Sequence, residues 1–363
     1  MRVLHLTAGS DAGGLSRYIF DMCTAMHERG DRVAVAGERG AWHWLFEGAP
    51  FPWIEVPLKG GPFALRRATK VLGKYLEENP VDVLHTHYRR CTLVARKLQK
   101  RFKIPIVYTS HLSGITISWP WSMFTDFGDW VHAPSEEVRD WIAATGKVPA
   151  DRIALIPHGI DVSRFPIAEE PVKLAARESL GLTKDDRVAA YVGRLDFPKN
   201  EEWMLDLAAA SREAIPNLKI LMAGEGPHEA MLKSRIEREK LGDRVKMLGH
   251  VDPLPVYQAC DALLLPSMRE GFSLVCAEAM CVGRPIFRCR TAGTNSLVVE
   301  NETGRAVAID HDEFVRGAID FLSCHDWVLH RMGLAAAARV REHFTFDRQF
   351  NETLALYDRA MRR

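Results

Sequence analysis

The chain has 363 residues, of which 47% are hydrophobic and 26% charged, and its formal net charge is +1 at pH 7. This length suits two domains better than one. No apolar run approaches the roughly 18 residues that span a bilayer, and no nucleic-acid recognition motif is present. We therefore expect neither a membrane-spanning protein nor a nucleic-acid partner. The seven cysteines lack CxxC and zinc-like spacing, which favours buried thiols in a cytoplasmic protein.

In the first half of the chain, short apolar runs alternate with longer amphipathic ones. The runs predict buried parallel strands at residues 2–8, 31–37, 82–87 and 105–111. Two amphipathic stretches predict helices that end at stop signals, 15–29 before Gly30 and 63–78 before Asn79-Pro80. A βαβ series of this kind predicts a doubly wound α/β domain.

A second series of strands follows a polar, irregular segment that ends near residue 186. Its expected strands are 187–193, 218–224, 244–249, 261–267 and 284–290. We therefore expect two Rossmann-like domains with a cleft between them. The predicted domains are residues 1–165 and 166–345, and the final helix, 346–363, is expected to pack back on the first domain.

Glycine-rich loops follow strands in both halves. The first, GSDAGGLSR, places Gly13 and Gly14 between a strand and a helix, where backbone N–H groups can approach an anion. It is not GxGxxG, so the dinucleotide fingerprint is absent. In the second half, GEGP begins with Gly224 and also joins a strand to a helix. For both loops, a plain turn and a ligand site remain alternatives.

Two cations lie in VGRLDFPKN, just past the first strand of the second half. Arg194 and Lys199 are placed where open α/β sheets bind their ligands. Arginine as a fork and lysine as a point charge can hold a diphosphate. The alternative is an ordinary solvated loop.

The segment PSMREGFSLVCAEAMCVGRP carries two glutamates, Glu270 and Glu278, eight residues apart. It reads as a strand end, a glycine turn and a short helix, and the free N–H groups of a helix start suit phosphate. The carboxylates are either solvated or hold a group other than phosphate. A glycosidase needs two flanking carboxylates, whereas both of these lie on one short segment, which argues against that activity.

Histidines end two of the predicted strands in the first half. His111 closes PIVYTSH, and such a lone histidine is either a hydrogen-bonded structural residue or a catalytic one. His85 and His87 share one strand face, but no carboxylate spacing supports a metal. We expect no metal site.

Taken in order, these pieces resemble the family 4 glycosyltransferases, the retaining enzymes of GT-B fold with an E-x7-E motif. The resemblance is carried by the glycine loop, the histidine of TSH, PHGID, GRLDFPK, GEGP, EGFSLVCAEAM followed by GRP, and FTFD. It covers nearly the whole chain. The fold it implies is α/β with two Rossmann-like doubly wound domains.

The resemblance implies a role for each matching residue. Arg194 and Lys199 would neutralise the donor diphosphate. Glu270 would hold hydroxyls of the donor sugar, with His111 close to its reacting carbon. The remaining residues would bind the donor. Gly14 would lie near the diphosphate and the acceptor, and Gly224 would contribute through the GEGP turn. Glu278 would bind the ribose, and the diphosphate would be bound by the backbone of Phe272, Ser273, Leu274 and Val275.

The expected activity is that of a retaining, metal-independent glycosyltransferase without a cofactor. It would move a hexose from a nucleoside diphosphate sugar, with uridine favoured over guanosine, to a cell-surface glycan, a glycolipid, another lipid-linked acceptor or a small molecule. Polysaccharide or glycolipid biosynthesis is the implied setting. The alternatives are another GT-B activity, such as a sugar-phosphate synthase or a phosphorylase, and a nucleotide-sugar-binding protein without catalysis.

Positive charge is concentrated between Lys59 and Lys103, a segment that contains twelve Lys and Arg residues and only three Asp and Glu residues. Arg66, Lys70 and Lys74 fall on one helix face, which can attract anionic lipid. This predicts a cytoplasmic protein that contacts the inner face of the cell membrane. The aromatic stretch 117–131 could add an apolar insertion or an acceptor surface. A solvated face and a core aromatic cluster are the alternatives.

Overall fold

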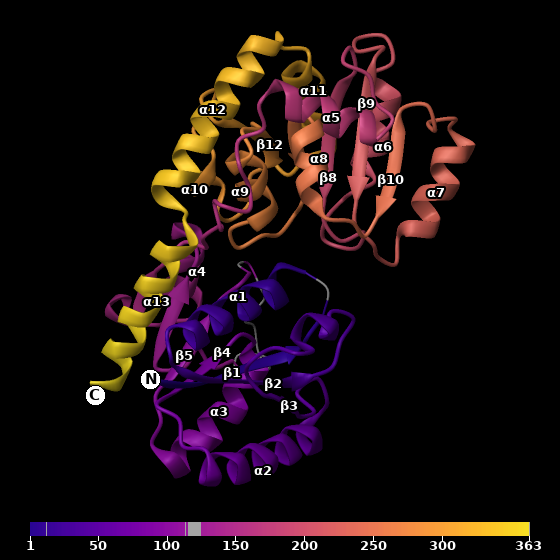
Figure 1. The fold of residues 1–363 in the computed structure, drawn as a ribbon. Helices are drawn as coiled ribbons and strands as arrows, with labels where there is room; N and C mark the ends of the chain where they lie inside the picture. The colour runs from indigo at the N-terminus through magenta and orange to yellow at the C-terminus, as the bar shows by residue number, and fades with distance from the viewer. Residues whose placement is uncertain (12, 113, 115–124, 363) are drawn as a thin grey trace. The chain divides into compact units, whose positions relative to one another are not determined.

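The computed structural model describes residues 1–11, 13–112, 114 and 125–362. It consists of two compact units, shown in Figure 1. Unit 1 comprises Met1–Pro157 together with Gln349–Arg363, and unit 2 comprises His158–Arg348. The second unit thus begins at His158, whereas the sequence placed the change after residue 165. Helix α13 (Phe346–Met361) begins in unit 2, and the rest of it belongs to unit 1.

Unit 1 is built on a seven-stranded parallel sheet with the strand order β3-β2-β1-β4-β5-β6-β7. Its strands are β1 (Arg2–Gly9), β2 (Arg32–Glu38), β3 (Trp53–Glu55), β4 (Val83–Thr86), β5 (Ile106–Thr109), β6 (Trp130–Ala133) and β7 (Ile153–Leu155). The order reverses between β1 and β4, and ligands of open α/β sheets bind at the carboxyl edge of such a switch point. The glycine loop follows β1 and is therefore at this edge.

Each α-helix of unit 1 buries an apolar stripe, whereas the short 3₁₀ segments bury one residue or none. These elements are α1 (Gly14–Glu28), η1 (His43–Phe46), α2 (Pro62–Glu78), α3 (Arg89–Phe102), α4 (Glu136–Thr145) and η3 (Ala150–Arg152). In α2 the buried residues Ala68, Leu72 and Leu76 recur at helical spacing. This stripe contributes to the core that α2 shares with α3, and the basic side chains lie on the opposite face of α2.

Unit 2 has a six-stranded parallel sheet with the strand order β10-β9-β8-β11-β12-β13. The strands are β8 (Arg187–Val192), β9 (Leu218–Ala223), β10 (Val245–Gly249), β11 (Ala262–Leu265), β12 (Ile286–Cys289) and β13 (Gly304–Val307). The helices are α5 (Glu170–Ser179), α6 (Trp203–Ala210), α7 (Glu229–Arg238), α8 (Pro253–Ala259), α9 (Leu274–Cys281), α10 (Thr294–Leu297), α11 (His311–Leu322) and α12 (Asp326–His343). The order is that of a Rossmann sheet with its switch point between β8 and β11, which confirms the predicted fold class.

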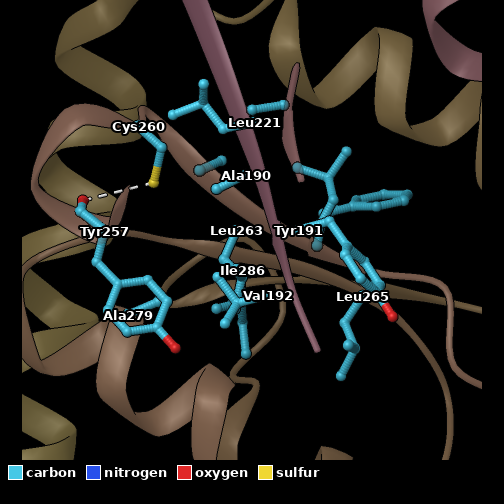
Figure 2. Close-up of a cluster of buried hydrophobic side chains, with 14 of the residues drawn as sticks. Ala190, Tyr191, Val192, Leu221, Tyr257, Cys260, Leu263, Leu265, Ala279 and Ile286 are labelled. Carbon is cyan, nitrogen blue, oxygen red and sulfur yellow. Dashed lines mark hydrogen bonds between the residues drawn. The ribbon is translucent and has the colours of Figure 1, made fainter. Parts of the chain in front are cut away.

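Figure 2 shows the core of unit 2 around the central strands. Tyr191 and Val192 on β8 and Leu263 on β11 are buried among apolar side chains. Tyr257 and Ala279, from α8 and α9, belong to the same cluster. This packing holds the carboxyl ends of β8 and β11 in place. Candidate site residues lie in the segments that come directly after these two strands in the sequence. Six of the seven cysteines are buried, as the sequence predicted, and Cys324 is partly exposed.

Candidate active site

In unit 2 the loop after β8 brings Lys199 to Glu270. The ammonium Nζ of Lys199 donates a hydrogen bond to Oε1 of Glu270 over 2.7 Å. Two further bonds hold the loop to the segment after β11, because the Asn200 amide donates to the Pro266 carbonyl and the Met268 N–H donates to the Pro198 carbonyl. The two residues are far apart in sequence and meet because β8 and β11 are neighbours in the sheet.

Glu270 is buried and ionised. Burial opposes its negative charge, but the ammonium of Lys199 and the guanidinium of Arg288 outweigh that effect and hold the pKa of Glu270 below its ordinary value. A buried carboxylate of this kind can accept hydrogen bonds from hydroxyl groups without first losing a proton. The pair therefore presents a fixed anion and a fixed cation side by side.

Arg194 is also paired in this structure. Its Nη2 lies 2.8 Å from Oδ2 of Asp196, two residues along the same loop. The Arg194 side chain is about half exposed, so its guanidinium has room to bind a second anion. The sequence predicted two cations for a diphosphate, and the structure shows that each of them is held by a carboxylate.

The turn from Glu270 into α9 presents backbone N–H groups. Ser273, the residue before the helix, has a left-handed backbone with φ of 78° and makes no side-chain cap bond to any described residue. The first N–H groups of α9 therefore lack a cap, and the side chains of Leu274 and Val275 are partly exposed. This is the arrangement in which a helix start binds an anion. Phe272 itself is buried and packs edge-on against Phe344.

Arg288, which was not predicted from the sequence, holds this turn through a hydrogen bond to the Phe272 carbonyl. Its guanidinium is fully buried and donates to the Thr291 hydroxyl (2.5 Å) and to the carbonyls of Ala292 (3.3 Å) and Phe272 (3.5 Å). It thereby ties together two loops at the carboxyl edge of the sheet. An arginine inside a predicted buried strand was the available signal, since arginine is almost never fully buried unless its donors are used.

Glu278 lies on the second turn of α9 and is oriented by a tyrosine. The hydroxyl of Tyr257, a buried residue of α8, donates to Oε2 of Glu278 over 2.7 Å. Burial and the Glu278 carboxylate both raise the pKa of Tyr257 far above its ordinary value, so the tyrosine stays a donor. Tyr257, which Figure 2 shows with its hydroxyl at the edge of the cluster, was not predicted.

Gly224 lies where two loop backbones touch. Its φ is +146°, and a Cβ at this position would lie 1.8 Å from the carbonyl oxygen of Gly193. The neighbouring Leu195 N–H donates to the Glu225 carbonyl. The GEGP turn therefore packs directly on the loop that carries Arg194, which only glycine allows.

In unit 1 the glycine loop is accompanied by a lysine. Gly14 is the first residue of α1, and Gly13 before it has φ of 136°. The ammonium of Lys59 donates to Oδ1 of Asp11 over 2.6 Å, and a Cβ at Gly9 would lie 3.0 Å from that ammonium. Lys59, which the sequence analysis placed in a basic surface, thus contacts the glycine loop.

His111 follows β5, is partly exposed, and hydrogen-bonds to a buried histidine. Its Nε2 lies 3.1 Å from Nδ1 of His87. Burial lowers the pKa of His111 to about 3, so the ring is neutral at pH 7. The ligand atoms of His5, His85 and His87 lie within 4.8 Å of one another, which is a geometry that could hold a metal. However, both ring nitrogens of His85 and of His87 already make hydrogen bonds, which a metal would have to replace.

Two further sequence motifs meet in unit 2. PHGID (157–161) is joined to FTFD (344–347) by two backbone hydrogen bonds. The Ile160 N–H donates to the Phe344 carbonyl, and the Phe346 N–H donates to the Ile160 carbonyl. A Cβ at Gly159 would lie 2.2 Å from the Thr345 carbonyl oxygen, so this contact requires a glycine. His158 stands edge-on to the Phe272 ring. Residues 117–124 of the aromatic stretch 117–131 lie outside the described part of the chain, and Phe127 and Trp130 of the same stretch are buried.

Comparison with known proteins gives two family matches that together span most of the chain. Residues 12–164 match the family described as Glycosyltransferase Family 4, and residues 172–340 match Glycosyl transferases group 1. The D-inositol 3-phosphate glycosyltransferase of Corynebacterium glutamicum (strain R) is 26% identical over 369 residues, covering 91% of this chain and 88% of the relative. The protein of the same name from Mycobacterium tuberculosis (strain ATCC 25177 / H37Ra) is 29% identical over 319 residues, covering 77% and 62%.

Solved structures share the fold over nearly the full length. Anabaena Alr3699/HepE in complex with UDP has a TM-score of 0.82 at 19% identity and covers 98% of both chains. The sucrose-phosphate synthase (tll1590) from Thermosynechococcus elongatus has a TM-score of 0.81 at 21% identity and covers 99% of both chains. Identities this low establish a common fold and no more.

Proposed function

The chain belongs to the family 4 glycosyltransferases, and on that premise we propose that it transfers a sugar from a nucleoside diphosphate sugar to an acceptor hydroxyl with retention of anomeric configuration. In this reaction the bond between the anomeric carbon and the diphosphate oxygen breaks, and the acceptor oxygen bonds to that carbon. The acceptor proton leaves with the diphosphate. The main task of the protein is then to stabilise the negative charge that grows on the diphosphate.

The observation that carries this proposal is the Lys199–Glu270 ion pair beside the uncapped start of α9. Lys199, Arg194 and the first N–H groups of α9 provide positive charge and donors for a diphosphate. Glu270 provides an ionised acceptor for hydroxyls of the donor sugar. A phosphate site alone has no use for a buried carboxylate, whereas a sugar diphosphate needs both kinds of group.

Three further residues are assigned to parts of the donor and the acceptor. We assign Glu278, whose carboxylate is oriented by Tyr257, to the ribose hydroxyls. His111 is assigned to the donor sugar, and Gly14 to the diphosphate and acceptor. We favour uridine as the base, a choice supported by the solved neighbour that binds UDP and UDP-glucose.

We expect the reaction to need neither a metal nor a cofactor, because cationic side chains can take the role of a metal at the diphosphate. UDP should raise the melting temperature by the same amount with and without excess chelator, through mass action on a native-state site. Differential scanning fluorimetry with a panel of nucleotide sugars measures this, and turnover of the best binder follows. The acceptors to test include D-inositol 3-phosphate, because relatives are named for it.

Arg194→Met tests whether the stabilisation comes from the proposed site, since it removes one proposed diphosphate contact. It should reduce the UDP-induced shift while the shift remains independent of chelator. Stabilisation that disappears with chelator would contradict the metal-free mechanism. Binding of UDP-glucose without transfer to any acceptor tested would favour the non-catalytic alternative.

The second part of the proposal concerns a basic face on α2. Four cations on this helix are exposed and form no ion pair with any described residue: Arg66, Arg67, Lys70 and Lys74. Phe63, on the first turn of the same helix, is 89% exposed. We propose that this face contacts anionic lipid, which would place the enzyme at the cytoplasmic side of a membrane. No described helix is long and apolar enough to cross a membrane.

This face is narrower than the sequence suggested, because Lys59, Arg96 and Arg101 are in ion pairs with carboxylates. Lys97, Lys100 and Lys103, on α3 and just after it, are exposed and form no ion pair with a described residue. Arg96 binds both Asp126 and Asp129, and Arg101 binds Glu77. Paired surface charges attract lipid weakly because their fields largely cancel. We assign the membrane contact to α2, because its four cations, unpaired among the described residues, share the helix with the exposed Phe63.

Vesicles that contain anionic lipid should bind the protein at low salt and release it at high salt. The triple change Arg66→Glu, Lys70→Glu and Lys74→Glu should abolish most of this binding and leave the UDP-induced shift intact. Co-sedimentation with vesicles of phosphatidylcholine, with and without phosphatidylglycerol, measures it.

A matched control reverses three exposed cations of unit 2, Lys184, Arg316 and Arg331, which changes the net charge equally. This control should still bind vesicles. If both triple variants bind equally, or if the wild-type protein ignores anionic vesicles, the α2 face is a solvated surface.

A further inference from the structure

Unit 2 contains a small pocket at the edge of its sheet that lies opposite the candidate active site. The pocket has a volume of about 80 Å³, and its lining includes Arg187, the first residue of β8, Asp261, directly before β11, and Arg284, two residues before β12. Lys173 of α5 lines it as well. These three strands are parallel, so the pocket lies at their amino ends, whereas the proposed donor loops follow the carboxyl ends of β8 and β11. The pocket is therefore separate from the proposed donor site.

The buried side chains around this pocket carry more positive than negative charge. Nζ of Lys173 lies 2.7 Å from the Asp261 carboxylate, and Nη2 of Arg177 lies 2.9 Å from it. Nη1 of Arg187 lies 3.8 Å from the same group. With Arg284 there are four largely buried cations, but Asp261 is the one buried carboxylate that the described residues place in the pocket. Three of the four positive charges therefore lack a buried counter-charge.

Two further carboxylates line the pocket, but both are exposed to solvent. Glu170 is an exposed residue, and the side chain of Asp326 is 89% exposed, although it pairs with Arg187 over 2.6 Å. Water and salt screen such exposed charges, so these carboxylates offset the buried cations only weakly. The interior of the pocket therefore stays positive.

Arg284 is the buried cation that most clearly lacks a counter-charge. It is only 5% exposed, and it donates from Nε to the Tyr257 carbonyl (2.9 Å) and from Nη2 to the Gln258 carbonyl (2.7 Å). Among the described residues, its Nη1 has no hydrogen-bond partner and its guanidinium has no ion pair. Burial lowers the pKa of Arg284, and the nearby Asp261 does not offset this effect. Because arginine stays charged in proteins, an anion in the pocket would relieve the cost of this buried charge.

We propose that this pocket binds a phosphate group, carried either by free phosphate or by a small phosphorylated metabolite. At pH 7 such a group has close to two negative charges and oxygens that accept hydrogen bonds in several directions. Lys173, Arg187 and Arg284 reach the pocket from three different elements, which suits a tetrahedral anion better than a planar carboxylate.

The size of the pocket fits the same ligand. Its volume equals that of roughly two or three water molecules at about 30 Å³ each, which is room for one phosphate group. A sugar attached to that group would extend into solvent. The site takes a phosphate group whether or not the chain transfers a sugar, because its residues are distinct from those of the proposed donor site.

Thermal unfolding in the presence of saturating UDP measures this binding, because UDP fills the other site that could take phosphate. Inorganic phosphate at ten times its Kd should raise the melting temperature by roughly 3–6 °C over potassium chloride of equal ionic strength. No rise over chloride, together with no heat in a calorimetric titration, would overturn the proposal. If UDP itself does not bind, the proposed function fails, and the same titration without UDP still tests the pocket.

Lys173→Met and Arg284→Gln test whether phosphate binds in the pocket. Each removes one cation and should weaken phosphate affinity by about tenfold or more, while the UDP-induced shift is retained. Arg284→Gln also loses bonds to two carbonyls and could lower the melting temperature by itself. Lys173→Met is the milder change, since the Asp261 carboxylate keeps its bonds from Arg177. Unchanged phosphate affinity in Lys173→Met and in folded Arg284→Gln would overturn the proposal.

Lys233→Met is the matched control, because Lys233 is also a lysine of unit 2 that pairs with a carboxylate, Glu229, but it lies on α7. It should bind phosphate as the wild type does. Phosphate affinity that falls in Arg194→Met but not in Lys173→Met would place the phosphate at the proposed donor site and contradict the proposal.

Three further ligands identify the group that is recognised. Glucose 6-phosphate that binds at least tenfold more tightly than inorganic phosphate would assign the pocket to a phosphorylated metabolite. Similar affinities would mean that the phosphate group alone is recognised. Glucose should have no effect that depends on Lys173, and acetate that stabilises the protein as well as phosphate does would overturn the assignment to phosphate.

Discussion

Glu270→Gln is expected to lower turnover of the nucleotide sugar by about one to two orders of magnitude, while the affinity for free UDP stays nearly unchanged. The carboxylate of Glu270 is buried and already ionised beside Lys199. On the proposed function it accepts hydrogen bonds from the sugar, and these strengthen as the sugar gains positive charge in the transition state. Glutamine keeps the size and one acceptor oxygen but loses the charge, and the loss of a charged hydrogen bond costs about 1.5–3 kcal/mol.

Glu278→Gln is the matched variant, because it makes the same chemical change on the same segment. Ribose contacts change little as the sugar leaves, so this change should weaken the binding of UDP and of the donor alike and lower kcat only slightly. Steady-state kinetics, calorimetric titration with UDP and melting temperature separate the two variants. Small and equal effects on all three quantities would mean that the spacing of eight residues carries no function.

The loss of the Lys199–Glu270 pair could itself destabilise the loop after β8, and the melting temperature reports this. Glutamine can still accept the hydrogen bond from Lys199, so the geometry of the pair should survive the change. A fall in turnover with an unchanged melting temperature assigns the effect to the reaction. A large fall in melting temperature would instead make Glu270 a structural residue.

The strands that the sequence predicted are those with a continuous apolar run, because a parallel strand buried on both faces needs one. The strands that it missed, β3, β6, β7 and β13, have three or four residues each. β6 is fully buried and β7 is apolar, so these two were missed because they are too short to give a detectable run. β3 has three residues, none of them fully buried, and β13 begins with a glycine and includes the partly exposed Arg305. Neither has a run to detect, and each forms because an adjacent strand offers a ladder of unpaired backbone groups.

The residues of the candidate site could be predicted from the sequence, but the hydrogen bonds between them could not. Glycines, cations and glutamates at strand ends could be found in the sequence, because ligands of α/β sheets bind there. The bond between Lys199 and Glu270 depends on β11 lying next to β8, which is a property of the sheet order. Tyr257 and Arg288 were missed for a related reason, since each acts on a loop that is distant in sequence and only the fold brings them together.

Gly224→Ala is expected to destabilise unit 2 by about 2–6 kcal/mol, a fall in melting temperature of roughly 5 °C or more. Two costs add here. The backbone of Gly224 has φ of +146°, which a residue with a side chain rarely adopts, and the new Cβ would lie 1.8 Å from the Gly193 carbonyl oxygen. Because that atom is backbone, it can yield only if the loop after β8 moves, and the loop carries Arg194 and Lys199. UDP binding should therefore weaken together with stability.

Gly242→Ala serves as the matched control in the same unit. A Cβ there meets no atom within 4 Å, and its backbone lies outside the left-handed range, so its stability should change by no more than about 0.5 kcal/mol. Thermal unfolding and UDP titration of both variants give the comparison. If Gly224→Ala melts like the wild type and still binds UDP, the two loops do not touch in the way described, and the GEGP turn is an ordinary connection between β9 and α7. If it melts lower but binds UDP normally, the turn supports the sheet and has no part in holding the donor.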